Sequence, residues 1–239
     1  MLTIREDDTI RDDRPAATPA FPRPMPPPAT LHDHLERAPL RGIEAKDHVF
    51  AEGDPKSHIY QVVTGAVCLY KVLPDGRRQV IDFAYGGDII SLGLGRYETC
   101  NAQATVATRV RCLAASAVSG LARHDPGVAM RMCQAMSEEL TAVRDHLVSV
   151  VHRSATERLV NFLLALSTRN VRHNRDATTI ELPMTRADIG DFLGLTIETV
   201  SRTFTKLKSL RLIAIDQGTT IRLHDIDGLN TLANGTSAA

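Results

Sequence analysis

The chain has 239 residues, of which 43% are hydrophobic and 23% charged, so it can bury a core in one large or two modest domains. Its formal net charge is zero, no apolar run reaches 18 residues, and its N-terminus lacks the apolar stretch of a secretory signal. We therefore expect a cytoplasmic protein with no membrane-spanning segment.

Charge is distributed unevenly along the chain. Residues 1–40 hold five basic and seven acidic residues, whereas residues 153–223 hold 11 basic and seven acidic residues, a net charge of +4. A basic C-terminal part fits a nucleic-acid-binding module, although many solvated surfaces are equally basic. The four cysteines form no CxxC pair, and we expect buried thiols rather than disulfides: Cys68, Cys100, Cys112 and Cys133.

The N-terminal half reads as a tail followed by a β domain. Residues 1–29 are rich in proline, so we expect a disordered tail there. Structure should begin near Thr30, with a short amphipathic segment at Leu31, Leu35 and Leu40. Short β-prone runs then alternate with glycine turns, and no helical crossovers separate them, which predicts an antiparallel β-roll or jelly roll over residues 30–125. The expected strands are 58–64, 67–73, 78–83, 89–90 and 102–113.

A long helix is predicted for residues 126–152, opened by Asp125-Pro126-Gly127. Its apolar residues recur in steps of three and four, close to the seam of a coiled coil. A single helix can show such a stripe by packing on its own domain. Because this stripe is long and narrow, we expect it to pair two copies of the chain. The residues of this expected seam are Met132, Met136, Leu140, Val143, Leu147 and Val150.

A second helix is expected over 155–166, followed by a polar loop over 169–178 and then by a pair of short capped helices. Thr185 is a good N-cap for a helix over 186–193, and Asp188 lies where a carboxylate suits the helix dipole. Gly194 allows a sharp C-terminal turn.

The next helix is predicted to begin two residues later. Thr196 is a good N-cap for a helix over 197–211, and two capped helices joined by so short a turn are typical of a DNA-binding helix-turn-helix. Two strands around Asp216-Gln217-Gly218 would form a wing. The predicted inner face of the second helix is Ile197, Val200, Phe204, Leu207 and Leu210.

The outer face of this helix carries groups that can read bases. Arg202 can donate twice to guanine, Glu198 can accept from the cytosine amino group, and Ser201 can bond either way or pack on a thymine methyl. A solvated face with a Glu198–Arg202 pair is the plainer alternative. With the caps, the turn and the wing around it, we favour a winged helix-turn-helix over residues 153–239, and an α+β fold overall.

The segment LPMTRADIGDFLGLTIETVSRTFTKLKSLRLI resembles the DNA-binding signature of the CRP/FNR superfamily of transcription regulators. The segment FAEGDPKSHIYQVVTGAVCLYKVLPDGRRQVIDFAYGGDI is similar to that family's cyclic-nucleotide-binding-like β-roll, so the resemblance covers roughly residues 30–225. The arrangement E-x-x-S-R at Glu198, Ser201 and Arg202 resembles the FNR/FixK type. The cyclic-AMP receptor type has an arginine before the glutamate and glycine in place of the serine.

The resemblance implies a homodimer that binds a double-stranded TTGAT…ATCAA palindrome and acts, mainly as an activator, through RNA polymerase. Glu198 and Arg202 would read the central C·G pair and Ser201 an outer thymine. It also implies control of low-oxygen or nitrogen-fixation genes. Positions that commonly touch phosphates match four residues here: Thr185, Arg186, Thr196 and Thr199.

Two ligand sites of the family are expected to be missing. The cyclic-nucleotide pocket uses a G-E-x-x-x-L stretch and then Arg-Ser/Thr, but this chain has GGDIISLGLGRYETCNAQA, with Cys100-Asn101-Ala102 near the place of the phosphate partners. The FNR iron–sulfur cluster needs an N-terminal cysteine group, and the first 67 residues hold no cysteine. We therefore expect no cofactor and no metal.

Two alternatives stay open. A gas- or redox-sensing regulator of the same family would use haem or thiols, for which Cys100 and the histidines leave room. An enzyme of the cupin type would use the His32-Asp33-His34 group as metal ligands, but no matching downstream glutamate and histidine stand in a strand. We favour a regulator that is not an enzyme.

Overall fold

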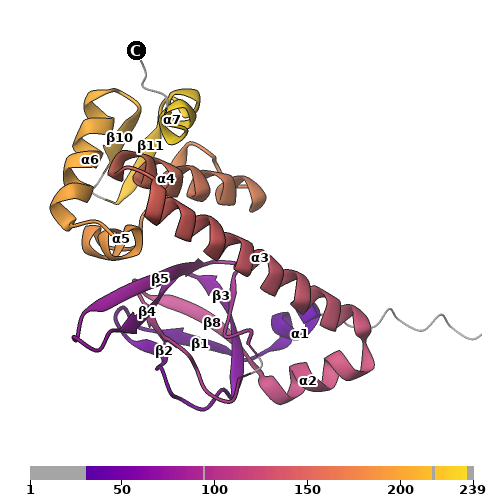
Figure 1. The fold of residues 1–239 in the computed structure, drawn as a ribbon. Coiled ribbons are helices and arrows are strands. Elements are labelled where there is room, and N and C mark those ends of the chain that lie inside the picture. The colour runs from indigo at the N-terminus through magenta and orange to yellow at the C-terminus, as the bar shows by residue number, and fades with distance from the viewer. Residues whose placement is uncertain (1–30, 94, 217–218, 236–239) are drawn as a thin grey trace, which may run out of the picture.

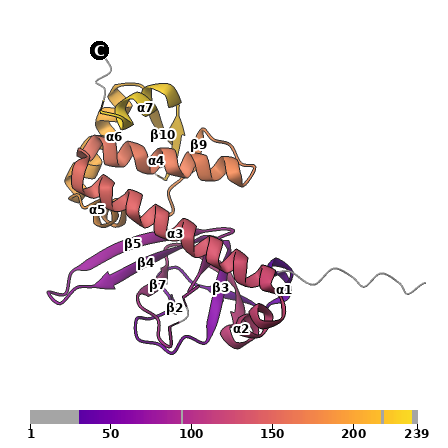
Figure 2. The same cartoon turned by 45° about the vertical axis from the view of Figure 1, so that its right-hand side comes forward.

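The computed structural model describes residues 31–93, 95–216 and 219–235. The disordered tail expected over residues 1–29 lies outside this part of the chain. An N-terminal β-roll lies beneath a C-terminal helical domain, and one long helix runs diagonally between them (Figures 1 and 2). The antiparallel sheets, the long helix and the helix-turn-helix confirm the α+β fold predicted from the sequence.

The roll consists of two four-stranded antiparallel sheets that enclose a small core. One has the order β1-β8-β3-β6 and the other β2-β7-β4-β5. Valines and alanines from both sheets, such as Val62, Val67 and Ala104, are almost completely buried between them. The strands are β1 (Leu40–Ile43), β2 (His48–Phe50), β3 (His58–Thr64), β4 (Ala66–Val72), β5 (Arg78–Tyr85), β6 (Ile89–Ile90), β7 (Asn101–Ala104) and β8 (Thr108–Ala114).

The tight turn between β3 and β4 requires glycine. Gly65 has φ +86°, and a Cβ there would come within 2.7 Å of the Ala107 carbonyl oxygen. Ala107 lies in a second turn, over residues 105–107, which divides the predicted strand 102–113 into β7 and β8. The sequence does not indicate this turn because residues 105–107 contain no glycine or proline.

Short helices flank the roll. α1 (Leu31–Arg37) buries Leu31 and Leu35 as expected, but Leu40 lies in β1 and is 41% exposed, so its predicted place on the amphipathic segment is wrong. α2 (Ala115–His124) was not predicted, and it packs against α3 (Pro126–His152). The long helix has the predicted bounds, and Asp125 caps it by accepting a hydrogen bond from the Gly127 amide.

The predicted stripe on α3 divides into a buried start and an exposed remainder. Met132 is 8% exposed and packs in one cluster with Leu31, Leu35 and Val128, so it belongs to the chain's own core. Its expected place in a dimer seam is therefore corrected. Val150 is half-buried, and the rest of the stripe is open to solvent in the single chain: Met136, Leu140, Val143 and Leu147.

The C-terminal domain is built on α4, which is longer than predicted. α4 spans Ala155–Arg172 rather than 155–166 because contacts from outside the helix hold its last turns. Arg169 pairs with Asp88 of the roll at 2.8 Å, and the Asn170 amide donates to the Asp176 and Thr179 carbonyls. The remaining elements are β9 (Thr179–Glu181), α5 (Arg186–Leu193), α6 (Ile197–Ser209), β10 (Ile213–Asp216), β11 (Thr220–Leu223) and α7 (Ile226–Ala233).

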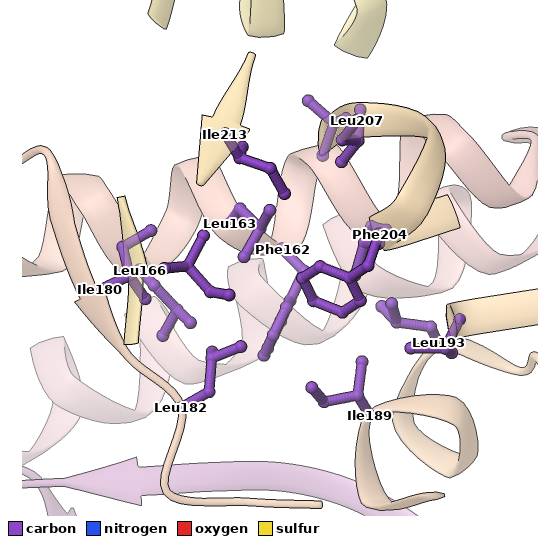
Figure 3. Packing of buried hydrophobic residues seen from close by; sticks show 14 of the residues in the cluster. Phe162, Leu163, Leu166, Ile180, Leu182, Ile189, Leu193, Phe204, Leu207 and Ile213 are labelled. Atoms are coloured by element: carbon purple, nitrogen blue, oxygen red, sulfur yellow. The ribbon is translucent and has the colours of Figure 1, made fainter. Parts of the chain in front are cut away.

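The core of this domain is a single apolar cluster between α4, α5, α6, α7 and the small sheet, and it reaches Cys68, Val80 and Phe83 of the roll. Figure 3 shows side chains such as Leu163, Ile189 and Phe204 converging there from different elements. The wing predicted from β10 and β11 has a third strand, β9, giving the order β10-β11-β9. Within the described ranges, no helix combines the length and apolar character needed to cross a membrane.

Candidate nucleic-acid interface

The first helix of the motif begins with a reciprocal cap. The Thr185 hydroxyl accepts a hydrogen bond from the Asp188 amide at 3.1 Å, and the Thr185 amide donates to the Asp188 carboxylate at 2.9 Å. Two of the amides that lack a partner within the helix are thereby satisfied. The capping residue, the carboxylate and both helix bounds are those that the sequence predicted.

The turn between α5 and α6 depends on two glycines. Gly194 is left-handed, with φ +65°, and ends α5 as predicted. Gly190 lies so close to the next segment that a Cβ would come within 2.7 Å of the Leu195 carbonyl oxygen. The two helices are thus held at close range, and Thr196 caps α6 by accepting from the Thr199 amide.

The inner face of α6 is shorter than predicted. Val200, Phe204 and Leu207 are buried, whereas Ile197 is 46% exposed and Leu210 is 48% exposed. The helix also ends at Ser209, and Arg211 takes a left-handed φ of +58°. Ile197 is the first residue of the helix, where no preceding turn covers it, so helical spacing alone placed it wrongly.

The N-terminal end of α6 is an exposed surface with mixed chemistry. Ile197, Glu198, Ser201 and Arg202 line one shallow open hollow. The structure therefore brings together the three predicted base-reading residues and adds an apolar side chain that the sequence pattern had placed inside. The sequence does carry a signal for this exposure: Ile197 directly follows the N-cap Thr196, so no earlier turn of the helix can cover it.

The polar groups of this surface interact weakly with one another. The Arg202 Nε lies 3.4 Å from the Glu198 carbonyl oxygen. Hydrogen bonding by its own backbone amide and by Thr196, together with the nearby Arg202 charge, lowers the pKa of Glu198, which therefore carries its negative charge at neutral pH. Both a charged acceptor and a guanidinium with further donors are therefore exposed here and can bond an external partner.

The four predicted phosphate-contact residues lie at the starts of the two helices. Thr185 and Thr196 are exposed caps, and Thr199 is half-buried with its hydroxyl 3.1 Å from that of Thr196. Arg186 lies over the Phe204 ring, with its guanidinium carbon 3.5 Å from the ring centroid. This stacking holds the cation of Arg186, at the start of α5, against the side of α6.

The β-roll contains a polar cluster around Lys56 and Glu98 whose side chains, unlike those at the start of α6, are nearly buried. The Lys56 and Glu98 side chains are 9% and 5% exposed and lie 3.8 Å apart. Glu98 accepts from the Ser91 hydroxyl at 2.6 Å, and Lys56 donates to the Gly93 carbonyl at 3.1 Å. The only cation of this cluster among the described residues is therefore already paired with a carboxylate.

The neighbouring residues are likewise occupied within the roll, since the Lys71 ammonium group pairs with the Glu52 carboxylate at 3.2 Å. Asn101 accepts from the Glu52 amide and lies within 3.5 Å of the Tyr70 carbonyl, so it is used by the sheet. Burial raises the pKa of the Cys100 thiol to about 11, so that it stays neutral.

All four cysteines are free thiols, but only part of the expectation for them holds. Cys68 is buried, Cys100 and Cys112 are half-buried, and Cys133 is exposed on α3, which corrects the expected burial. In the described part of the chain, no three His, Cys, Asp or Glu side chains gather as a metal site, and the His32 side chain lies outside that part.

Comparison with known proteins agrees with this division into two parts. The model of the cyclic nucleotide-binding domain matches residues 40–123, and the model of the Crp-like helix-turn-helix domain matches residues 157–232.

Similar full-length proteins are also known. The chain is 41% identical over 193 residues to the nitrogen fixation regulation protein FixK of Bradyrhizobium diazoefficiens, covering 77% of this chain and 81% of that protein. It is 38% identical over 185 residues to the transcriptional activatory protein AadR of Rhodopseudomonas palustris, covering 77% of each. The solved structure of FixK2 from Bradyrhizobium japonicum superposes with a TM-score of 0.77 at 35% identity, covering 84% of this chain and 98% of that one.

Proposed function

Because the chain belongs to the CRP/FNR family of transcription regulators, we propose that it is a homodimer that binds a specific DNA palindrome and mainly activates transcription. The observation that carries this proposal is the surface at the start of α6, where Glu198, Ser201 and Arg202 are exposed together. Relatives named as regulators and an activator support the same reading.

The reading chemistry follows from the donors and acceptors of these side chains. Arg202 donates to O6 and N7 of a guanine, and Glu198 accepts from the amino group of a cytosine, so that they read the central C·G pair of each half-site. Ser201 contacts an outer thymine in a TTGAT…ATCAA sequence. Ile197 adds an apolar contact that suits a thymine methyl group.

The dimer is needed because one recognition helix reads too few bases for useful affinity. The exposed stripe on α3 pairs two copies and places their α6 helices in successive major grooves, about 34 Å apart. This stripe is apolar over four residues that each expose at least 40% of their surface: Met136, Leu140, Val143 and Leu147.

The regulated genes are proposed from the relatives. Proteins named for the regulation of nitrogen fixation are more than one third identical to this chain, which supports low-oxygen and nitrogen-fixation genes as targets. The β-roll and the wing offer surfaces to RNA polymerase. We also propose that no cyclic nucleotide controls the protein, because Glu98 already holds the Lys56 ammonium group.

The test is binding of purified protein to a TTGAT…ATCAA duplex, by wild type and by Arg202→Ala, on the cognate duplex and on one with the central C·G pair changed. We expect the substitution to cost about 1–3 kcal/mol on the cognate duplex and to abolish discrimination at that pair. Lys208→Ala, an exposed cation near the end of α6, is the matched control and should keep this discrimination. Equal loss by Arg202→Ala on both duplexes would contradict the reading role.

A further inference from the structure

One arginine of the β-roll reaches across to the helix-turn-helix. Arg78, the first residue of β5, donates from Nη1 to the Asp188 carboxylate of α5 at 2.9 Å. The two side chains are 32% and 12% exposed. A charge-assisted contact between residues 110 positions apart thus joins the two domains of one chain.

Asp188 already has a task in its own helix. One carboxylate oxygen accepts from the Thr185 amide and hydroxyl, at 2.9 and 2.7 Å, and the other accepts from Arg78. The roll is therefore attached to the capped start of the helix that sets the position of α6. A displacement of Arg78 would therefore act directly on the first turn of α5, where the motif begins.

The arginine itself is held firmly on the roll. Its guanidinium lies over the Tyr70 ring, 4.1 Å from the centroid, and its Nη2 donates to the Cys68 sulfur at 3.0 Å. Burial raises the pKa of the Cys68 thiol to about 12, so the sulfur stays neutral and leaves the arginine charge for Asp188. Gln79 adds a second link by donating to the Asp191 carbonyl of α5.

An aromatic cluster completes the junction beside this pair. Phe83 of β5 contacts Phe192 of α5 edge-on, with centroids 5.5 Å apart, and both lie near Phe162 of α4. His146 of α3 stacks on Phe192 at 4.2 Å. The roll, the long helix and the motif therefore meet in one packed contact, and both views show α5 directly above β5 (Figures 1 and 2).

This contact leaves the reading surface free. On the motif it uses the Asp188 and Phe192 side chains and the Asp191 carbonyl, all in α5, whereas Glu198 and Arg202 on α6 remain exposed. The junction therefore orients the motif without covering it. In a dimer joined through α3, the orientation of each motif relative to its roll and long helix sets the separation of the two recognition helices.

We propose that Arg78 is a positioning residue for DNA binding: through Asp188 it fixes the orientation of the helix-turn-helix, and thereby the spacing of half-sites that the dimer accepts. This inference rests on the proposed function, since it presupposes a dimer on a palindrome. It adds a residue of the β-roll, far from the bases, to those that determine which DNA is bound.

The experiment measures the affinity of wild type, Arg78→Ala and Arg78→Lys for two duplexes. One carries the palindrome, and the other has two extra base pairs between the half-sites, which turns one half-site by about 70° relative to the other. We expect Arg78→Ala to bind the natural spacing about 5- to 150-fold more weakly, the range typical of coupling between sites. Its affinity for the wider spacing should change much less, so that the ratio of the two affinities falls. Arg78→Lys, which keeps the charge, should restore part of this ratio.

Arg77→Ala is the matched control. Arg77 is the neighbouring residue, its side chain is 77% exposed, and it pairs with Asp75 in the hairpin turn rather than with α5. This variant should bind both duplexes as the wild type does. Asp188→Asn tests the same contact from the other side, because it removes the charge while keeping an oxygen for the Thr185 amide, and it should also narrow discrimination.

The outcomes separate the two hypotheses. If wild type binds the palindrome but Arg78→Ala and Asp188→Asn discriminate between spacings as wild type does, the positioning role is wrong and the proposed function stands. Equal loss on both duplexes would also overturn it, because a merely structural role has that effect. If wild type binds neither duplex specifically, the proposed function fails, and the positioning role fails with it.

Discussion

The helix-turn-helix and the β-roll use their polar side chains in opposite ways. At the start of α6, Glu198, Ser201 and Arg202 are exposed, and the Arg202 Nε makes only a long contact of 3.4 Å with the Glu198 carbonyl oxygen. In the roll, Lys56 and Glu98 are almost buried and bonded to each other and to the surrounding loop. Side chains kept open can recognise an external partner, whereas side chains satisfied internally hold a fold together. This difference indicates that an external partner is bound by the C-terminal domain rather than by the roll.

The largest expected effect tests whether the open surface depends on the core beneath it. Leu163 on α4 is fully buried in the cluster of Figure 3, so Leu163→Ala should lower the free energy of unfolding by about 2–5 kcal/mol through lost burial and a residual cavity. Chemical denaturation measures this. Val171→Ala on the same helix, where the side chain is 56% exposed, should stay within about 0.5 kcal/mol. If the two variants lost similar amounts of unfolding free energy, this cluster would not be the main source of the domain's stability.

A smaller effect sharpens the division between the exposed groups that we propose contact DNA and the groups that hold the fold. Thr185 has both properties, since it is exposed and also caps α5. Thr185→Ala should cost about 0.5–2 kcal/mol of stability and also weaken DNA binding, while Thr185→Ser should restore the cap and most of the binding. Thermal unfolding and a binding titration measure the two effects. If DNA affinity stayed unchanged while stability fell, Thr185 would serve only as a cap.

The last prediction concerns the roll, where we expect cyclic AMP to have no effect on thermal stability. A ligand present at 100 times its dissociation constant stabilises a protein by about 2.7 kcal/mol. Because Glu98 holds the Lys56 ammonium group and Cys100 is neutral, we expect cyclic AMP to leave thermal unfolding unchanged, as adenosine does. A shift with cyclic AMP but not with adenosine would show that the roll still binds a phosphate, and the comparison between the two domains would no longer hold.

The features predictable from the sequence are those whose causes lie within a few residues. The caps at Thr185 and Thr196, the left-handed Gly194 and the bounds of α5 agree with the prediction because each depends on neighbours in the chain. The exposure of Glu198, Ser201 and Arg202 also follows from helical spacing alone.

The features that escaped prediction depend on distant contacts. α4 extends past residue 166 because Arg169 reaches Asp88 and Asn170 bonds the following loop. β9 is a strand because it pairs with β11, and the sequence does not indicate the Arg78–Asp188 pair because its members are 110 positions apart. Such contacts leave no periodic signal in a single sequence.

The third strand of the wing has a consequence for synthesis of the protein. The Thr220 hydroxyl of β11 bonds Glu181 of β9, 39 positions earlier, and α7 supplies Leu229 and Ala233 to the core that supports α6. A ribosome releases these late segments after the recognition helix itself has emerged, and such long-range pairing waits for them. In a nascent chain, α6 therefore gains its full support only after β11 and α7 have also left the ribosome.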